Sequence, residues 1–164
     1  GFERLNFAFR SIDGDTVSIN DKRFIDKVVI IQLMGSWCPN CMDETGFLSE
    51  YYKNNKDKGV EIVALAYEAT TDFTRSQKSL RKFQQKFDVQ YPMLITGVAV
   101  GDSLKTEKTL PQLSFIKVFP TTIFIDRNGK VSKFHTGFYG PGTGEHYETF
   151  KKEFNETVDG LLRK

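Results

Sequence analysis

Two short apolar runs, separated by a helical segment, constrain the fold more than any other feature of the sequence. Residues 28–34 (Val-Val-Ile-Ile-Gln-Leu-Met) and residues 60–67 (Val-Glu-Ile-Val-Ala-Leu-Ala-Tyr) are rich in β-branched side chains and do not alternate between polar and apolar. Such runs are typical of parallel strands covered on both faces. Between them the spacing predicts a helix that begins after Pro39 and that Gly59 ends. Strand, helix and strand in this order predict a right-handed βαβ unit.

The flanking segments predict two hairpins and further helices. Residues 7–19 form a hairpin that turns at Asp13-Gly14, and residues 121–134 form another that turns at Asn128-Gly129, because tight turns favour these dipeptides. The other predicted elements are a helix capped by Asp72 with Leu80, Phe83 and Phe87 on one face, a strand at 91–95, a short helix at 103–108, and a C-terminal helix with Tyr147, Phe150, Phe154, Val158 and Leu161 on one face. The order predicts an α/β fold, a mixed sheet with helices on both faces.

The composition limits the domain organisation and the function classes. A chain of 164 residues with 15 Phe and 6 Tyr has the length and the core material for one domain, which we place over residues 1–164. A net charge of +2 gives no case for binding nucleic acid, and no run of about 18 apolar residues is present to span a bilayer. The chain begins at Gly1, which we interpret as the start of a trimmed domain. The natural protein could also carry a signal, a lipid anchor or another domain before Gly1, and the sequence leaves this open.

Both cysteines lie in one tetrapeptide, Cys38-Pro39-Asn40-Cys41, where the strand at 28–34 gives way to the helix. Two cysteines three residues apart in a first helical turn can form a disulfide. We expect the helix start to expose Cys38, and the free N–H groups and the helix dipole there favour a thiolate. A thiolate attacks disulfides, and the neighbouring thiol then resolves the mixed disulfide. Pro39 suits the first helical position, which needs no N–H.

Two other interpretations of the cysteine pair are weaker. A structural zinc site needs about four ligands, and His135 and His146 are the remaining soft candidates, about a hundred residues away. An inert buried pair conflicts with the expected exposure of Cys38. A CxxC motif at a strand–helix junction within a βαβ unit instead predicts a redox-active pair.

These motifs resemble the thioredoxin superfamily, and more closely its TlpA/ResA branch of extracytoplasmic thiol–disulfide oxidoreductases. The matching segments are residues 9–19, 35–41, 119–126, 128–129 and 136–137, with an inserted helix and strand at about 72–95. The resemblance implies a thioredoxin-like fold with an N-terminal hairpin and a TlpA-type insertion. It also implies that the chain reduces disulfides of partner proteins in the bacterial periplasm or at the cell-envelope face. An upstream thiol protein would re-reduce the pair, and no metal or nucleotide cofactor is implied beyond the redox-active disulfide.

The resemblance assigns a substrate-binding surface around Cys38. Pro120 matches the cis-proline that faces the active-site disulfide, and the backbone of Phe119 beside it matches the segment that pairs with a substrate peptide. Trp37 matches an aromatic wall beside the first cysteine, and Pro39 belongs to the same surface. Phe119 is larger than the residue usual before this proline, so we expect its ring to narrow the groove.

Glu44 matches an acidic residue that some members hold near the buried cysteine. Positions 41 and 44 lie on one helix face, so a partly buried Glu44 carboxyl with a raised pKa would accept the proton of Cys41. The alternative is a solvated acid in the first helical turns. Gln32 stands six residues before Cys38, where thioredoxin has a buried Asp, and an amide cannot exchange a proton. Proton transfer therefore falls to Glu44 or to water.

Two alternative functions remain open. A peroxiredoxin-type peroxide reductase usually needs a lone peroxidatic cysteine with a nearby Thr and Arg, and the Cys38/Cys41 pair argues against it. The second alternative is a binding module that docks partners through the Pro120 groove and has weak turnover.

Overall fold

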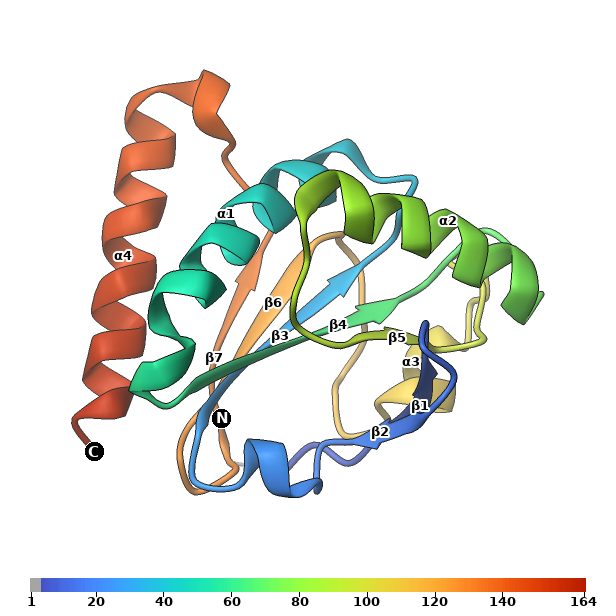
Figure 1. Cartoon of the computed structure of the whole chain (residues 1–164), viewed down its shortest axis with the longest axis horizontal. Coiled ribbons are helices and arrows are strands. Elements are labelled where there is room, and N and C mark those ends of the chain that lie inside the picture. Colours follow the sequence, from blue (N-terminus) through green and yellow to red (C-terminus); the bar gives the residue numbers. More distant parts are fainter. Residues whose placement is uncertain (1–3) are drawn as a thin grey trace.

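The computed structural model describes residues 4–164, so Gly1 lies outside the described residues. Within this range, one mixed sheet of seven strands has the order β2-β1-β5-β4-β3-β6-β7 (Figure 1). The strands are β1 (Ala8–Ser11), β2 (Thr16–Ser18), β3 (Val28–Met34), β4 (Val60–Ala66), β5 (Met93–Ile95), β6 (Thr121–Ile125) and β7 (Val131–Thr136). β3, β4 and β5 are parallel, whereas β6 runs antiparallel to β3. The predicted mixed α/β sheet is confirmed.

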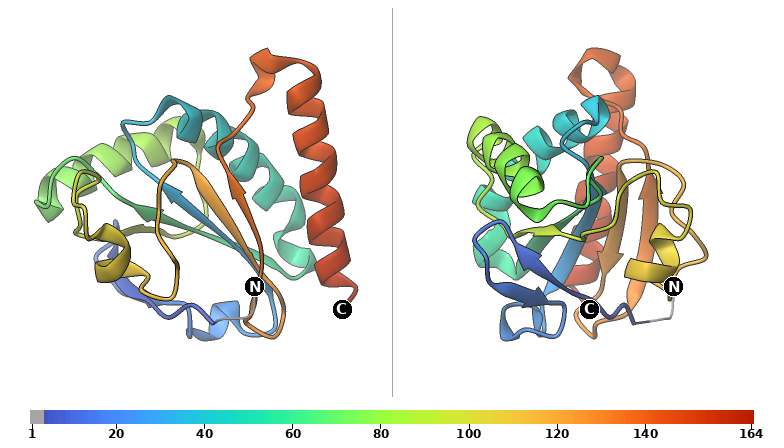
Figure 2. Two further views of the ribbon diagram at one scale, coloured as in Figure 1. Left: turned by 180° about the vertical axis from the view of Figure 1, so that it is seen from behind. Right: turned by 90° about the vertical axis from the view of Figure 1, so that its right-hand side faces the viewer.

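The helices divide unequally between the two faces of the sheet. They are α1 (Pro39–Asn55), α2 (Phe73–Phe87), α3 (Lys105–Thr109) and α4 (Glu145–Leu162). The three long helices α1, α2 and α4 lie on one face, and only the short α3, with the N-terminal segment and residues 110–118, covers the other (Figure 2). Helices therefore occupy both faces, as predicted, but the second face is covered mainly by loops.

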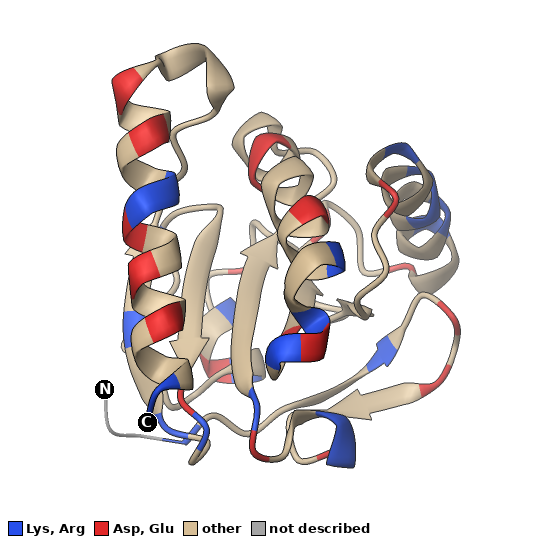
Figure 3. Cartoon of the chain, turned by 60° about the vertical axis from the view of Figure 1, so that its left-hand side comes forward, with Lys and Arg blue, Asp and Glu red and all other residues tan. Residues whose placement is uncertain are grey.

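The central strand β3 explains why the sequence shows no alternation there. All seven of its residues are buried, because each face of the sheet has its own apolar cluster. Ile30 packs under the long helices, whereas Ile31 packs on the opposite side. Many of the charged residues lie on the helices, whereas β3 and β6 carry none (Figure 3). This pattern is what a strand covered on both sides requires.

Local signals in the sequence set the ends of several elements. Asp72 caps α2, since its Oδ1 accepts hydrogen bonds from the N–H groups of Thr74 and Arg75. Gly14 has a φ of 95°, which the β1–β2 turn requires and which a residue with a Cβ adopts only with strain. In residues 4–164, none of the helices has the length and apolar character needed to cross a membrane.

Candidate active site

The site forms at one edge of the sheet, where β3 ends and α1 begins. The loop between them is fixed by residues that follow β4. Ser36 donates from its N–H and its hydroxyl to the carboxylate of Glu68, at 2.8 and 2.5 Å. The indole Nε1–H of Trp37 donates to the carbonyl oxygen of Tyr67 at 2.8 Å. Sequence reasoning missed Glu68; the available signal was an acid directly after a buried strand whose end meets the CxxC loop.

Cys38 is the N-cap residue of α1. Its Sγ accepts a hydrogen bond from the N–H of Cys41 at 3.2 Å and lies 3.7 Å from the carbonyl oxygen of Phe119. Both cysteines are free thiols in this structure. The expectation that the helix start exposes Cys38 is wrong, since the residue is only 4% exposed. The Phe119–Pro120 segment, joined by a cis peptide bond, lies against the sulfur and covers it.

The four residues expected to bind substrate are placed differently around Cys38. Pro39 is exposed at the first position of α1, whereas Pro120 is buried. Trp37 is 43% exposed, and its ring meets that of Phe119 edge-on, with centroids 5.6 Å apart. Phe119 is half-buried and also packs against Tyr67, at 5.5 Å between ring centroids. The Phe119 ring therefore forms part of an aromatic cluster beside the sulfur.

Glu44 is fully buried beneath the cysteine pair, so the alternative of a solvated acid is wrong. Its Oε2 accepts a hydrogen bond from the hydroxyl of Thr122 on β6 at 2.7 Å, and among the described residues its Oε1 has no partner. Burial raises the pKa of Glu44 from 4.5 to about 7, and the bond from Thr122 opposes this rise. The carboxyl therefore titrates near neutrality, where it can take or give a proton.

Cys41 is fully buried on the same side of α1 as Glu44. Burial raises the pKa of the Cys41 thiol above its ordinary value, and the neighbouring Cys38 and Glu44 add to the rise. A thiol of this kind keeps its proton near neutral pH and needs a base before it can act as a nucleophile.

Gln32 holds the start of α1 against the sheet. Its Nε2 donates to the hydroxyl of Thr45 at 3.2 Å and to the carbonyl oxygen of Cys41 at 3.5 Å. Its neighbour across the β3–β6 pairing is Thr122, the residue that binds Glu44. Gln32 and Thr122 thus fix the backbone of Cys41 and the carboxyl of Glu44 from two adjacent strands. Neither link was predicted from the sequence.

The two histidines considered as zinc ligands pack against aromatic rings. His135 lies 5.2 Å from the ring of Phe150, and His146 stacks on Tyr139 at 4.8 Å, both between centroids. Over residues 4–164, no three side chains of His, Cys, Asp or Glu gather into a group that could hold a metal ion.

A CxxC pair at the junction of a central strand and a helix, with the carbonyl oxygen of the residue before a cis-proline 3.7 Å from its first sulfur, defines a thioredoxin-like thiol–disulfide oxidoreductase. A profile of the Redoxin family matches residues 6–149, and the chain belongs to that family. Within the thioredoxin superfamily it is TlpA/ResA-like, as the sequence resemblance predicts.

Individual relatives agree with this assignment. The chain is 29% identical over 153 residues to the thiol-disulfide oxidoreductase ResA of Bacillus thuringiensis subsp. konkukian, covering 93% of this chain and 77% of the relative. It is 27% identical over 137 residues to ResA of Bacillus subtilis, covering 84% and 67%. A crystal structure of a putative thiol:disulfide interchange protein DsbE from Chlorobium tepidum superposes with a TM-score of 0.67 at 22% identity, covering 96% and 99%. That last similarity supports the fold.

Proposed function

We propose that the chain reduces disulfide bonds of partner proteins outside the cytoplasm, in the periplasm or at the cell-envelope face. The observation that carries the chemistry is the Cys38 sulfur at the N-cap of α1, held by the N–H of Cys41 and backed by a buried carboxyl. The names of the ResA relatives support the reaction, and the resemblance to the extracytoplasmic TlpA/ResA branch supports the location.

In the first step, the Cys38 thiolate attacks one sulfur of the partner disulfide. A bond forms between Cys38 Sγ and that sulfur, the partner's S–S bond breaks, and the other partner sulfur leaves as a thiolate. The N–H of Cys41, 3.2 Å from Cys38 Sγ, donates to the attacking sulfur, and the helix dipole favours its negative charge. Trp37, Pro39 and the Phe119–Pro120 segment form the surface that the partner meets.

In the second step, Cys41 resolves the mixed disulfide. Its thiol transfers a proton to the Glu44 carboxylate, and the resulting thiolate attacks Cys38 Sγ and expels the partner's second sulfur as a thiolate. The partner gains two electrons, and the chain is left with a Cys38–Cys41 disulfide. Glu44 suits this task because its pKa of about 7 gives a substantial carboxylate fraction near neutral pH. A dithiol of an upstream reductant then restores the pair, so the redox-active disulfide is the cofactor.

Turnover with a disulfide-bonded protein tests this function. The chain, at a concentration well below that of the substrate, should reduce insulin disulfides in the presence of dithiothreitol, faster than dithiothreitol alone. Cys38→Ser should abolish the acceleration. Acceleration that survives Cys38→Ser would refute the assignment. Consumption of hydrogen peroxide by the reduced chain at a comparable rate would instead support the peroxide-reductase alternative.

A further inference from the structure

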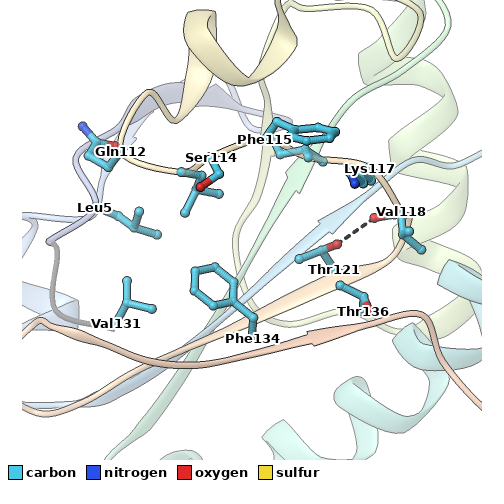
Figure 4. A pocket seen from close by; sticks show the side chains of 12 residues that line it. Leu5, Gln112, Ser114, Phe115, Lys117, Val118, Thr121, Val131, Phe134 and Thr136 are labelled. Atoms are coloured by element: carbon cyan, nitrogen blue, oxygen red, sulfur yellow. Dashed lines mark hydrogen bonds between the residues drawn. The ribbon is translucent and has the colours of Figure 1, made fainter.

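A hollow of about 580 Å³ lies on the loop-covered face of the sheet, between the segment 112–118 and the edge strand β7 (Figure 4). We call it the β7 groove. Its walls are mainly apolar, and three large side chains around it are exposed: Phe115 at 57%, Val118 at 43% and Phe134 at 45%. Exposed apolar side chains gathered around one hollow are typical of a binding surface, and this volume is within the usual range of binding pockets.

The β7 groove begins beside the redox centre. Val118 lines it and directly precedes Phe119, whose carbonyl oxygen lies 3.7 Å from Cys38 Sγ. Thr121, which also lines the groove, donates its hydroxyl hydrogen bond to the carbonyl oxygen of Val118 at 2.7 Å (Figure 4). A partner whose disulfide reaches Cys38 therefore has this groove directly next to its own chain.

The dimensions and chemistry of the groove fit an extended peptide. Its lining follows β7 from Val131 to Thr136, a span of roughly 17 Å at about 3.3 Å per residue, which suits five or six extended residues. β7 is the last strand of the sheet, so one of its edges is unpaired within the described part of the chain. Among the lining residues the charged one is Lys117, whose Nζ lies 4.4 Å from the centroid of the Phe115 ring. The complementary ligand is an apolar segment with an acidic residue.

We propose that the β7 groove binds an extended, apolar, acid-containing segment of the partner protein next to its target cysteine. The inference rests on the proposed function and names its substrate class. Apolar side chains of the partner would pack on Phe134 and Phe115, and its acidic residue would face Lys117. The groove thereby selects disulfides by the sequence that flanks them.

Synthetic peptides with one cysteine, disulfide-bonded to thionitrobenzoate, test the proposal through the rate of thionitrobenzoate release. In one peptide, five residues rich in Val, Leu and Phe extend from the cysteine. In a polar partner of equal length, the five residues are Ser, Thr and Gln. Each peptide is made in two versions, with the five residues before the cysteine in one and after it in the other. The reduced wild-type chain should react with an apolar peptide at least about 10-fold faster than with its polar partner, because burial of one large apolar side chain already has an effect of this size. Equal rates for all pairs would overturn the proposal.

Variants then locate the preference. Phe134→Thr should lower the apolar-to-polar rate ratio at least about 3-fold, whereas the matched control Ile25→Thr, at an exposed isoleucine outside the groove, should leave the ratio unchanged. Two further apolar peptides end in Glu and in Lys, and the wild-type chain should prefer the one that ends in Glu. Lys117→Glu should reverse this preference. This variant tests the same surface if Phe134→Thr fails to fold. An unchanged ratio in Phe134→Thr together with an unchanged charge preference in Lys117→Glu would overturn the proposal.

Two further measurements distinguish this inference from the proposed function and from self-association of the chain. Reaction of the wild-type chain with dithiobis-nitrobenzoate tests the proposed function alone, so a normal rate without any peptide preference refutes the groove and retains the oxidoreductase. Sedimentation of the wild-type chain tests whether a second copy fills the groove. A dimer that Phe134→Thr dissociates would assign the surface to self-association and overturn the proposal.

Discussion

Replacing Glu44 with glutamine should remove a pH dependence from the stability of the fold. The carboxyl has a pKa of about 7 in the folded chain because it is fully buried, against an ordinary value of 4.5. Below pH 4.5 it holds its proton in both the folded and the unfolded chain. Between pH 4.5 and 7 the unfolded chain releases the proton while the folded chain keeps it, so the free energy of unfolding falls as the pH rises. The dependence fades about one pH unit above the folded-state pKa, where both states have released the proton.

The shift sets the size of the effect. The difference between about 7 and 4.5 corresponds to about 3 kcal/mol in total, since one pKa unit is worth about 1.4 kcal/mol. Most of it, about 2.5 kcal/mol, falls between about pH 5 and about pH 8. Wild type should therefore lose about this much free energy of unfolding relative to Glu44→Gln across that interval.

Urea unfolding of the reduced proteins at a series of pH values measures the difference directly. Titrating groups that Glu44 does not influence contribute equally to wild type and to the variant, so the comparison reports mainly on Glu44. Glu50→Gln, at an exposed position of the same helix, serves as the matched control and should follow the wild-type profile. A difference between wild type and Glu44→Gln that changes by less than about 0.5 kcal/mol over the interval would refute the buried, neutral-pH carboxyl.

Three further changes probe the groups around the cysteines. Thr122→Val removes a hydrogen bond that lowers the pKa of Glu44. The pKa of the Glu44 carboxyl, followed by carbon NMR, should therefore rise by about 1 unit. An unchanged titration midpoint would contradict the contact. Gly35→Ala places a Cβ against the indole of Trp37, the one tryptophan of the chain, and should lower the free energy of unfolding by about 1–3 kcal/mol and shift the indole fluorescence; unchanged emission would count against this packing. Phe119→Thr should widen the range of protein disulfides that are reduced, because the ring narrows the approach to Cys38; slower reduction of every protein substrate would show that the ring attracts partners instead.

The fold could be predicted because its signals are local. The mainly apolar, non-alternating run of β3, the Asp-Gly and Asn-Gly turns and the Asp72 cap each act within a few residues, and the structure confirms all of them. The uneven covering of the sheet could not be predicted in this way. It depends on how residues 110–118 and the N-terminal segment pack across the second face, and their sequence has no regular period.

The candidate site likewise has features that local sequence predicts and features that depend on distant segments. Spacing alone places Cys41 and Glu44 on one face of the helix that follows Cys38, and in the structure both are buried residues of α1. The burial of Cys38 depends on the Phe119–Pro120 segment, 81 residues further on, so a helix-start argument gives the wrong exposure. The contacts of Glu44 with Thr122 and of Ser36 with Glu68 likewise join distant segments. Such contacts follow from the packing of α1 and of the loops after β3 and β4, which the local pattern of a single segment does not specify.

Trapping of the mixed disulfide tests the division of labour between the two cysteines most directly. Cys41→Ser should accumulate a covalent adduct with a disulfide-bonded protein, because Cys38 attacks and nothing resolves the intermediate. Cys38→Ser should accumulate none, since Cys41 is fully buried and burial raises its pKa. Peptide mapping by mass spectrometry identifies the linked residue. Adducts on Cys38 in Cys41→Ser are the expected result, and adducts found only on Cys41 in Cys38→Ser would contradict the mechanism.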